Sequence, residues 1–432
     1  MAVTTRDQIP SEEGSPVAPP APTVFDFDIY LLLIVVALLA IGLLMVYSTT
    51  FDWSYLEYGS PVRIFLNQLR SLIIGAAVMV IAWRLDYRIL RDRRVALGIM
   101  IVTIVALGGL LILNNNRALG AQRSFYQGSI QPGEAAKLAV IIYFGAWLAS
   151  RQEQLQRIGY GLIPFSILVG LVGGLIVLQP DLSTAAIIVL TAWTMFFVAG
   201  ANIIQIVLAG MGAALVAWMV STQFDYARQR LVEHLQAMQD LTQASWHVQQ
   251  AIIAFTASGS RQGSAFTPNW FGVGLGQSRQ KFGFLPAAHT DSIFAIIGEE
   301  LGLFGCLVVV MLFALFVWRA FRIARNAREP FGAVLATGIG AWIAYEALLN
   351  VAVMTAVIPF TGVPLPFISY GGSSLVTVMA AVGLLMSISR HRPPLLRRIR
   401  PPSTGNATYE GLPQGRRYRR LSRVGRRGSV DY

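Results

Sequence analysis

Long runs of apolar residues, separated by short polar segments, account for most of this sequence. A helix of about 20 apolar residues is needed to span a bilayer. Ten runs approach or exceed that length, namely 29–48, 64–83, 95–113, 134–150, 160–178, 184–199, 203–220, 292–318, 333–358 and 373–388. The pattern predicts an all-α, polytopic membrane protein with ten transmembrane helices.

The longest polar interval, 221–290, separates the seventh apolar run from the eighth. Within it, 225–239 and 244–257 have the pattern of amphipathic helices that rest at a membrane interface. Residues 1–25 are rich in Pro, Glu, Ser and Thr, which predicts a disordered segment. We therefore expect a transmembrane domain over 26–390, with a large loop at 221–290, followed by a basic, disordered tail over 391–432.

Composition supports the membrane assignment and charge placement orients it. The 432 residues are 55% hydrophobic and 13% charged, whereas soluble domains carry roughly 25% charged residues. The net charge of +12 raises the possibility of nucleic-acid binding. However, the arginines gather after the second, fourth and eighth runs and in the tail, as the positive-inside rule requires if both termini are cytoplasmic. We expect no nucleic-acid partner, and the loop 221–290 should lie outside.

Several charged residues fall at the ends of apolar runs that this orientation places outside. They are Arg70, Glu134, Lys137, Asp181 and Asp291. Lys137 and Lys281 are the only lysines in the sequence. One interpretation is helix capping, because carboxylates complement the dipole at a helix N-terminus. The other is a shared polar cavity, in which helix N-termini and cations form a site for an anion such as a lipid pyrophosphate. Capping explains the two cations poorly, since a positive charge at an N-terminus opposes the dipole.

Other embedded acids allow more than one role. Glu134 and Lys137 are three residues apart, so they share a helix face and can pair. Glu299 and Glu300 lie deeper in the eighth run, where they could extend the cavity or brace neighbouring helices. Glu346 fits an interhelical hydrogen-bonding role.

Several segments form specific motifs. They are Gly272 to Gly302, which includes His289-Thr-Asp291; Gly362 to Ser374, which includes Pro-Phe-Ile-Ser-Tyr-Gly-Gly-Ser-Ser; Gln131-Pro-Gly-Glu-Ala-Ala-Lys137; and Gln179-Pro-Asp-Leu-Ser-Thr184. These motifs resemble those of the SEDS family (shape, elongation, division and sporulation), and details favour its FtsW branch over its RodA branch. The resemblance covers most of the chain.

The resemblance implies ten helices and a peptidoglycan glycosyltransferase that polymerises lipid II at the outer face of the bacterial cytoplasmic membrane, in cell division or cell-shape maintenance. It identifies Asp291 as the essential acid, which we interpret as a general base. The candidate substrate-binding residues are Arg70, Arg123, Glu134, Lys137, Asp181, Lys281, Ser369 and Ser373. A divalent cation, Mg or Mn, could assist on the pyrophosphate, although no ligand cluster in the sequence demands one.

The implied partners are lipid II, the nascent glycan strand and a single-span class B penicillin-binding transpeptidase. Two alternatives remain open at this stage. Embedded charges also mark transport paths, so the chain could be a flippase or transporter for lipid-linked precursors. It could also serve chiefly as a scaffold for other cell-wall enzymes.

Overall fold

The computed structural model describes residues 28–114, 131–240, 244–257 and 270–390. Within these ranges the chain forms only helices and connecting turns, which confirms the all-α prediction. The helices are α1 (Ile29–Tyr58), α2 (Arg63–Arg84), η1 (Tyr87–Arg91), α3 (Arg93–Asn114), α4 (Pro132–Ser150), α5 (Leu162–Val177), α6 (Leu182–Val198), α7 (Ile203–Gln223), α8 (Asp225–Ala237), α9 (Trp246–Ala257), α10 (Ile293–Arg325), α11 (Pro330–Met354) and α12 (Gly372–Arg390).

Each of the ten predicted spans coincides with one of these helices. Among the described residues, seven helices are long and apolar enough to cross a membrane, and α5 and α6 are shorter apolar helices. The chain is therefore a multi-pass membrane protein, while the count of ten spans stays a prediction. Contacts between Cα atoms divide the chain into 1–392 and 393–432. The predicted disordered segment 1–25 and the tail 391–432 lie outside the described residues.

The first helix differs most from its predicted bounds, because α1 continues ten residues past 48 to Tyr58. Thr49 and Thr50 follow the apolar run without ending the helix, since their hydroxyls donate to the carbonyls of Met45 and Val46 at 2.8 and 2.7 Å. The helix ends instead at Gly59, which adopts the left-handed conformation. The end of an apolar run is thus not the end of the helix.

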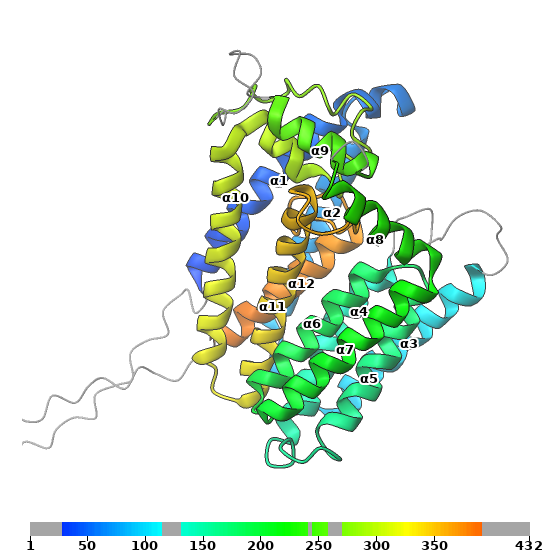
Figure 1. The fold of residues 1–432 in the computed structure, drawn as a ribbon. Helices are drawn as coiled ribbons and strands as arrows, with labels where there is room; N and C mark the ends of the chain where they lie inside the picture. Colours follow the sequence, from blue (N-terminus) through cyan, green and yellow to red (C-terminus); the bar gives the residue numbers. More distant parts are fainter. Residues whose placement is uncertain (1–27, 115–130, 241–243, 258–269, 391–432) are drawn as a thin grey trace, which may run out of the picture. The chain divides into compact units, whose positions relative to one another are not determined.

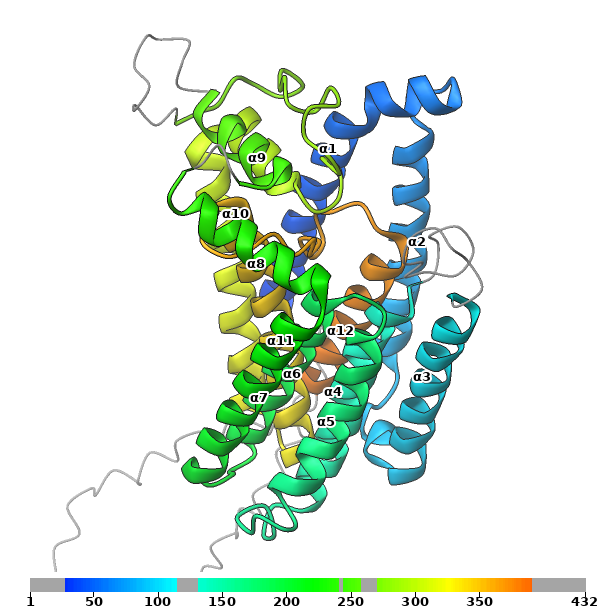
Figure 2. The ribbon, with the colours of Figure 1, turned by 45° about the vertical axis from the view of Figure 1, so that its right-hand side comes forward.

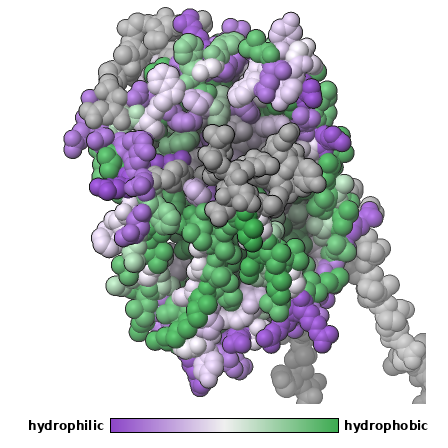
Figure 3. Space-filling view, turned by 90° about the vertical axis from the view of Figure 1, so that its right-hand side faces the viewer, coloured by the Kyte–Doolittle hydropathy of each residue, from purple (hydrophilic) through white to green (hydrophobic). Residues whose placement is uncertain are grey.

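Two central helices organise the bundle. α11 packs against α10, α6 and α4, and α12 packs against α2 (Figure 1). Both α11 and α12 are mostly buried, whereas few residues of α2 and α7 are buried. Such exposure is expected of helices that face lipid. In Figure 3, apolar side chains cover the lower half of one face, with polar residues above and below them.

The interval between α7 and α10 contains the two additional helices that its pattern predicts. α8 follows α7 directly, and α9 packs against α10 and α11. Figures 1 and 2 place both helices at the end of the bundle where α10 begins. These helices therefore flank the turn that carries Asp291.

Candidate functional site

The segment between α11 and α12 is bound to the turn that precedes α10. The Ser369 hydroxyl donates to the Thr290 carbonyl at 2.6 Å and accepts from the Leu365 N–H at 2.7 Å. The Tyr370 N–H donates to the His289 carbonyl at 2.8 Å. Ser369, a predicted substrate ligand, thus fixes the backbone beside Asp291.

Asp291 is half-buried, and its main chain and side chain contact different elements. Its carbonyl accepts a 2.8 Å hydrogen bond from the side-chain amide of Asn350, which also donates to the Val363 carbonyl at 2.6 Å. Its carboxylate lies against Gly362, where an added Cβ would be 3.0 Å from Oδ2. The predicted catalytic carboxylate therefore sits where α10, α11 and the turn around Gly362 meet.

His289 adds no positive charge beside this carboxylate. Its ring packs edge-on against Trp53 and Tyr370, with centroid distances of 4.9 and 5.6 Å. Burial lowers the pKa of His289 below its ordinary value, so the imidazole is neutral at pH 7. Burial also raises the pKa of Tyr370.

Asp181 caps α6, as the capping interpretation requires. Its carboxylate accepts from the Thr184 N–H at 3.2 Å and from the hydroxyls of Ser183 and Thr184, both at 2.9 Å. The Ser183 hydroxyl also lies 3.1 Å from the Thr361 carbonyl. The N-terminus of α6 is thereby joined to the turn that touches Asp291.

Replacing Asp181 with alanine is expected to lower stability by about 1 kcal/mol or more, because a helix cap and two buried hydroxyl partners are lost together. Thermal unfolding in detergent would measure the change. Asn202 provides a matched control, since it caps α7 from an exposed position by accepting from the Ile204 N–H. Equal losses from Asp181→Ala and Asn202→Ala would contradict a special role for the buried cap.

Lys137 lies in a buried cluster of three charges. Its Nζ is 2.9 Å from the Glu134 carboxylate and 2.6 Å from Oε1 of Glu346 on α11, and 5.3 Å from the centre of the Trp342 ring. The predicted Glu134–Lys137 pair and the interhelical role of Glu346 are both confirmed. Because Lys137 already has two carboxylate partners, it holds α4 to α11.

The charged cluster and Asp291 contact the same face of α11. Glu346 and Asn350 are four residues apart, which is one helical turn, or roughly 6 Å along the axis. One turn binds Lys137 and the next binds the backbone of Asp291. The structure therefore joins the predicted base and the predicted cation through α11.

The N-terminus of α4 meets that of α12. The Gln131 N–H donates to the Ser373 hydroxyl at 3.3 Å, so Ser373 links the two helices. A Cβ added to Gly133 would lie 3.8 Å from the side chain of Thr184 on α6. Three helix N-termini thus adjoin one another, as the shared anion site requires.

On α2, Gln68 contacts this region directly. The Gln68 amide donates to the Ser369 carbonyl at 3.4 Å and accepts from the Gly371 N–H at 3.2 Å. Arg70 is exposed and lies two residues further along α2. The role of Arg70 as a substrate ligand stays a prediction.

Of the two remaining predicted cations, Lys281 has its partners away from this turn. Lys281 is bound to Glu300, 3.3 Å away on α10, beyond the turn that carries Asp291. Arg123 lies outside the described residues. The roles predicted for both residues as substrate ligands stay predictions.

A cavity of about 320 Å³ lies between α8, α9 and the end of α11. Its lining includes Arg230, Glu233 and Phe360. Arg230 donates to the Phe360 carbonyl at 2.8 Å and places its guanidinium 5.6 Å from the centre of that ring. Phe360 is two residues from Gly362, so this cavity and the Asp291 turn share one segment.

Three contributing residues were not singled out from the sequence: Asn350, Gln68 and Gly362. The first two carried a usable signal, because a polar side chain within an apolar run is costly unless it has partners. Gly362 opens a segment that resembles the family, but nothing in the sequence indicates its contact with Asp291.

A metal site is not assembled by the protein alone in the part of the chain that the structure describes. No group of three or more His, Cys, Asp or Glu side chains there could hold an ion. Magnesium is commonly held by one or two carboxylates together with substrate phosphates. Asp291 could contribute one such carboxylate, and the predicted Mg or Mn stays a prediction.

Comparison with known proteins identifies the family. The chain is 37% identical over 372 residues to the "Probable peptidoglycan glycosyltransferase FtsW" of Bacillus subtilis, covering 84% of this chain and 90% of the relative. It is 35% identical over 367 residues to the protein of the same name from Trichlorobacter lovleyi, covering 84% of this chain and 93% of the relative.

Solved structures share the fold. The rod shape determining protein RodA of Thermus thermophilus aligns with a TM-score of 0.60 at 23% identity, over 85% of this chain and 97% of that one. A chain from a structure titled "Structural coordination of polymerization and crosslinking by a peptidoglycan synthase complex" aligns with a TM-score of 0.66 at 24% identity, over 85% and 98% of the two chains. The sequence profile of the FtsW/RodA/SpoVE cell cycle proteins matches residues 29–393, and the chain belongs to that family.

Proposed function

We propose that this protein is a peptidoglycan glycosyltransferase that polymerises lipid II into glycan strands at the outer face of the cytoplasmic membrane, in cell-wall synthesis for division. Relatives named as FtsW glycosyltransferases match most of its length. The observation that carries the mechanism is the position of Asp291, with its carboxylate against Gly362 and its backbone fixed by Asn350.

In the proposed reaction, the acceptor hydroxyl attacks the anomeric carbon of the donor sugar. A new glycosidic C–O bond forms, the bond from that carbon to the lipid pyrophosphate breaks, and the pyrophosphate leaves with the negative charge. Asp291 takes the proton of the attacking hydroxyl, as a positioned carboxylate can. The adjoining N-termini of α4, α6 and α12 offer backbone N–H groups and positive dipole ends to the departing anion.

In this proposal the buried Lys137 does not contact the pyrophosphate directly. Its ammonium is bound by Glu134 and Glu346, so its positive charge is already offset by two carboxylates. It holds α4 against the face of α11 that also binds Asp291, and so keeps the anion site and the base in register. Arg123 would supply a positive charge to the leaving group.

The partner and the orientation complete the proposal. The structural relative from a complex titled for both polymerisation and crosslinking supports a class B penicillin-binding transpeptidase as partner. The arginine-rich segments support an orientation in which both termini are cytoplasmic. The α8–α9 end of the molecule then faces outward, where lipid II and the nascent strand are found.

The test is reconstitution of the purified protein in liposomes with lipid II, with and without the transpeptidase. We expect glycan polymer on gels and no translocation of a fluorescent lipid-linked precursor. Translocation without polymer would identify a flippase instead. Normal growth of cells carrying only the Asp291→Asn form would identify a scaffold.

A further inference from the structure

The eighth predicted span, α10, is kinked near the end that carries Asp291. Gly302 has φ 70° and ψ −165° inside the helix, a conformation that is essentially restricted to glycine. The kink separates a short segment, 293–301, from the remainder of α10. Asp291 stands just before that short segment, so its position depends on what holds the segment in place.

The outer-loop segment 270–281 supplies hydrogen bonds at the kink. The carbonyls of Glu299 and Glu300 accept from the N–H groups of Val273 and Gly274 at 2.9 and 3.0 Å. The Phe304 N–H donates to the Trp270 carbonyl at 3.0 Å. In a regular α-helix, each of these N–H and carbonyl groups of α10 would bond to a residue of the same helix four positions away. At the kink, the loop provides the partners instead.

The approach of the loop is close enough to require a glycine. A Cβ on Gly272 would lie 2.4 Å from the Glu300 carbonyl oxygen. The loop backbone is therefore inserted at the kink and does not merely cover it.

Two buried carboxylates extend the attachment. Glu299 accepts from the Ser278 hydroxyl and, at 2.9 Å, from the Arg279 N–H. Glu300 accepts from the Ser278 N–H at 3.4 Å. Ser278 thus binds both glutamates, and the exposed Arg279 takes part through its backbone.

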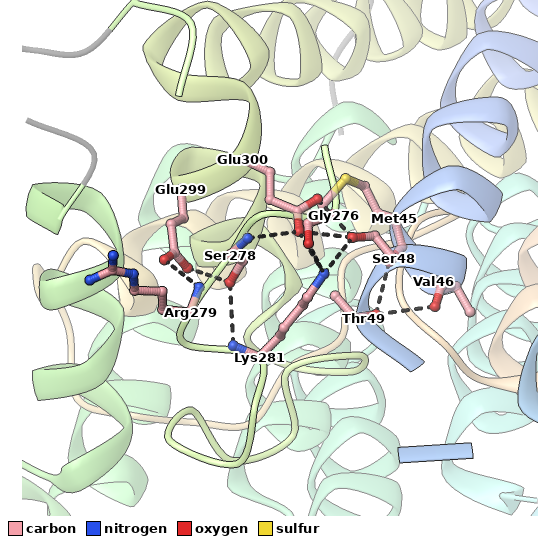
Figure 4. Close-up of polar contacts among 10 residues, drawn as sticks. All are labelled: Met45, Val46, Ser48, Thr49, Gly276, Ser278, Arg279, Lys281, Glu299 and Glu300. Carbon is pink, nitrogen blue, oxygen red and sulfur yellow. Dashed lines mark hydrogen bonds and ion pairs between the residues drawn. The ribbon is translucent and has the colours of Figure 1, made fainter. Parts of the chain in front are cut away.

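Lys281 and Ser48 join the loop and the kink to α1, as Figure 4 shows. The Lys281 ammonium lies 3.3 Å from Glu300, donates to the Gly276 carbonyl at 2.8 Å and lies 3.3 Å from the Ser48 hydroxyl. Ser48 in turn donates to Glu300 at 2.8 Å. The side chains of Lys281 and Glu300 are 5% and 0% exposed, so the ammonium is fully engaged inside the protein.

We infer that these five residues form a latch that positions Asp291: Ser48, Ser278, Lys281, Glu299 and Glu300. The inference rests on the proposed function, because it assigns the latch to the base of that reaction. Segment 293–301 is a lever of roughly 13 Å from the kink, so a tilt of about 5° moves its far end by about 1 Å. A displacement of that size can lower a reaction rate about 100-fold. Lys281 is accordingly a positioning residue that acts through Glu300.

The test compares four variants with the wild type in liposomes: Lys281→Met, Glu300→Gln, the double variant, and Arg279→Met as a matched control. Arg279→Met removes a cation from the same loop but leaves its backbone contact to Glu299. We expect Lys281→Met to lower kcat about 10- to 100-fold with KM for lipid II within about twofold. The double variant removes both members of the Lys281–Glu300 ion pair, so its thermal stability should return toward wild type while kcat stays at least about tenfold low. Arg279→Met should match wild type.

Hydrogen exchange of the purified variants gives a readout that needs no activity. Peptides covering 293–301 should exchange faster in Lys281→Met and in the double variant than in Arg279→Met. A raised KM with unchanged kcat in Lys281→Met would make the lysine a substrate ligand and overturn the inference. Full recovery of kcat in the double variant would show that the cluster only balances charge and does not position Asp291. Polymer from the wild type upholds the proposed function in either case, and without that polymer the exchange data still decide whether the latch holds α10.

Discussion

Replacing Asp291 with asparagine is expected to lower polymerisation of lipid II by roughly 10² to 10⁴, the range over which a positioned general base contributes. The amide has nearly the same shape but cannot accept the proton of the attacking hydroxyl. Folding should be unaffected, because the bond that ties Asp291 to α11 is made by its backbone carbonyl, which accepts from Asn350. Polymer length on gels and kcat in liposomes measure the loss.

Asn350→Ala is the matched comparison for this assignment. It removes the amide that binds both the Asp291 and Val363 carbonyls but leaves the carboxylate intact. We expect a smaller loss of kcat together with lower thermal stability. Near-normal turnover by Asp291→Asn would show that Asp291 is not the general base.

Lys137→Met is expected to destabilise the protein by about 3–5 kcal/mol, the usual cost of removing one partner from a buried ion pair. Two carboxylates, Glu134 and Glu346, would remain in the interior without the cation that bridges them at 2.9 and 2.6 Å. The expected phenotype is loss of folded protein, measured by size-exclusion yield and thermal unfolding.

The triple variant Lys137→Met, Glu134→Gln, Glu346→Gln separates charge from packing. It carries no formal charge at these positions, so most of the stability should return. If the single variant were as stable as wild type, the ammonium would not hold α4 to α11. If the triple variant folded but polymerised normally, the cluster would have no part in keeping the anion site and the base in register.

The sequence predicted the helices well because transmembrane segments follow a local rule. Each of the ten apolar runs corresponds to a helix, and the amphipathic pieces of the long loop correspond to α8 and α9. Local chemistry also predicted the Asp181 cap and the pair of Glu134 with Lys137, since the partners are three residues apart. In each case the information lies within one or two helical turns.

Contacts over long distances in sequence were not predictable in this way. Ser48 and Glu300 are 252 residues apart, and no period in the sequence indicates that they meet. In the sequence, Gly302 is one more small residue in an apolar run, so the kink is not predictable from it. The kink depends on contacts with a loop that precedes the helix. Arg70 shows the same limit, because its depth in α2 is visible from the sequence and the helix face that it occupies is not.

The contacts of Lys137 and Lys281 suggest a reason why these two positions carry lysine in a sequence whose other basic residues are almost all arginine. Arginine supplies almost all of the positive charge, yet each of the two lysines stands where one compact cation meets several oxygens at once. A guanidinium is planar and larger, and it presents its donors as a fork instead of a tetrahedron. If the base composition of the genome favours arginine codons over lysine codons, we therefore expect lysine to be retained at these two positions.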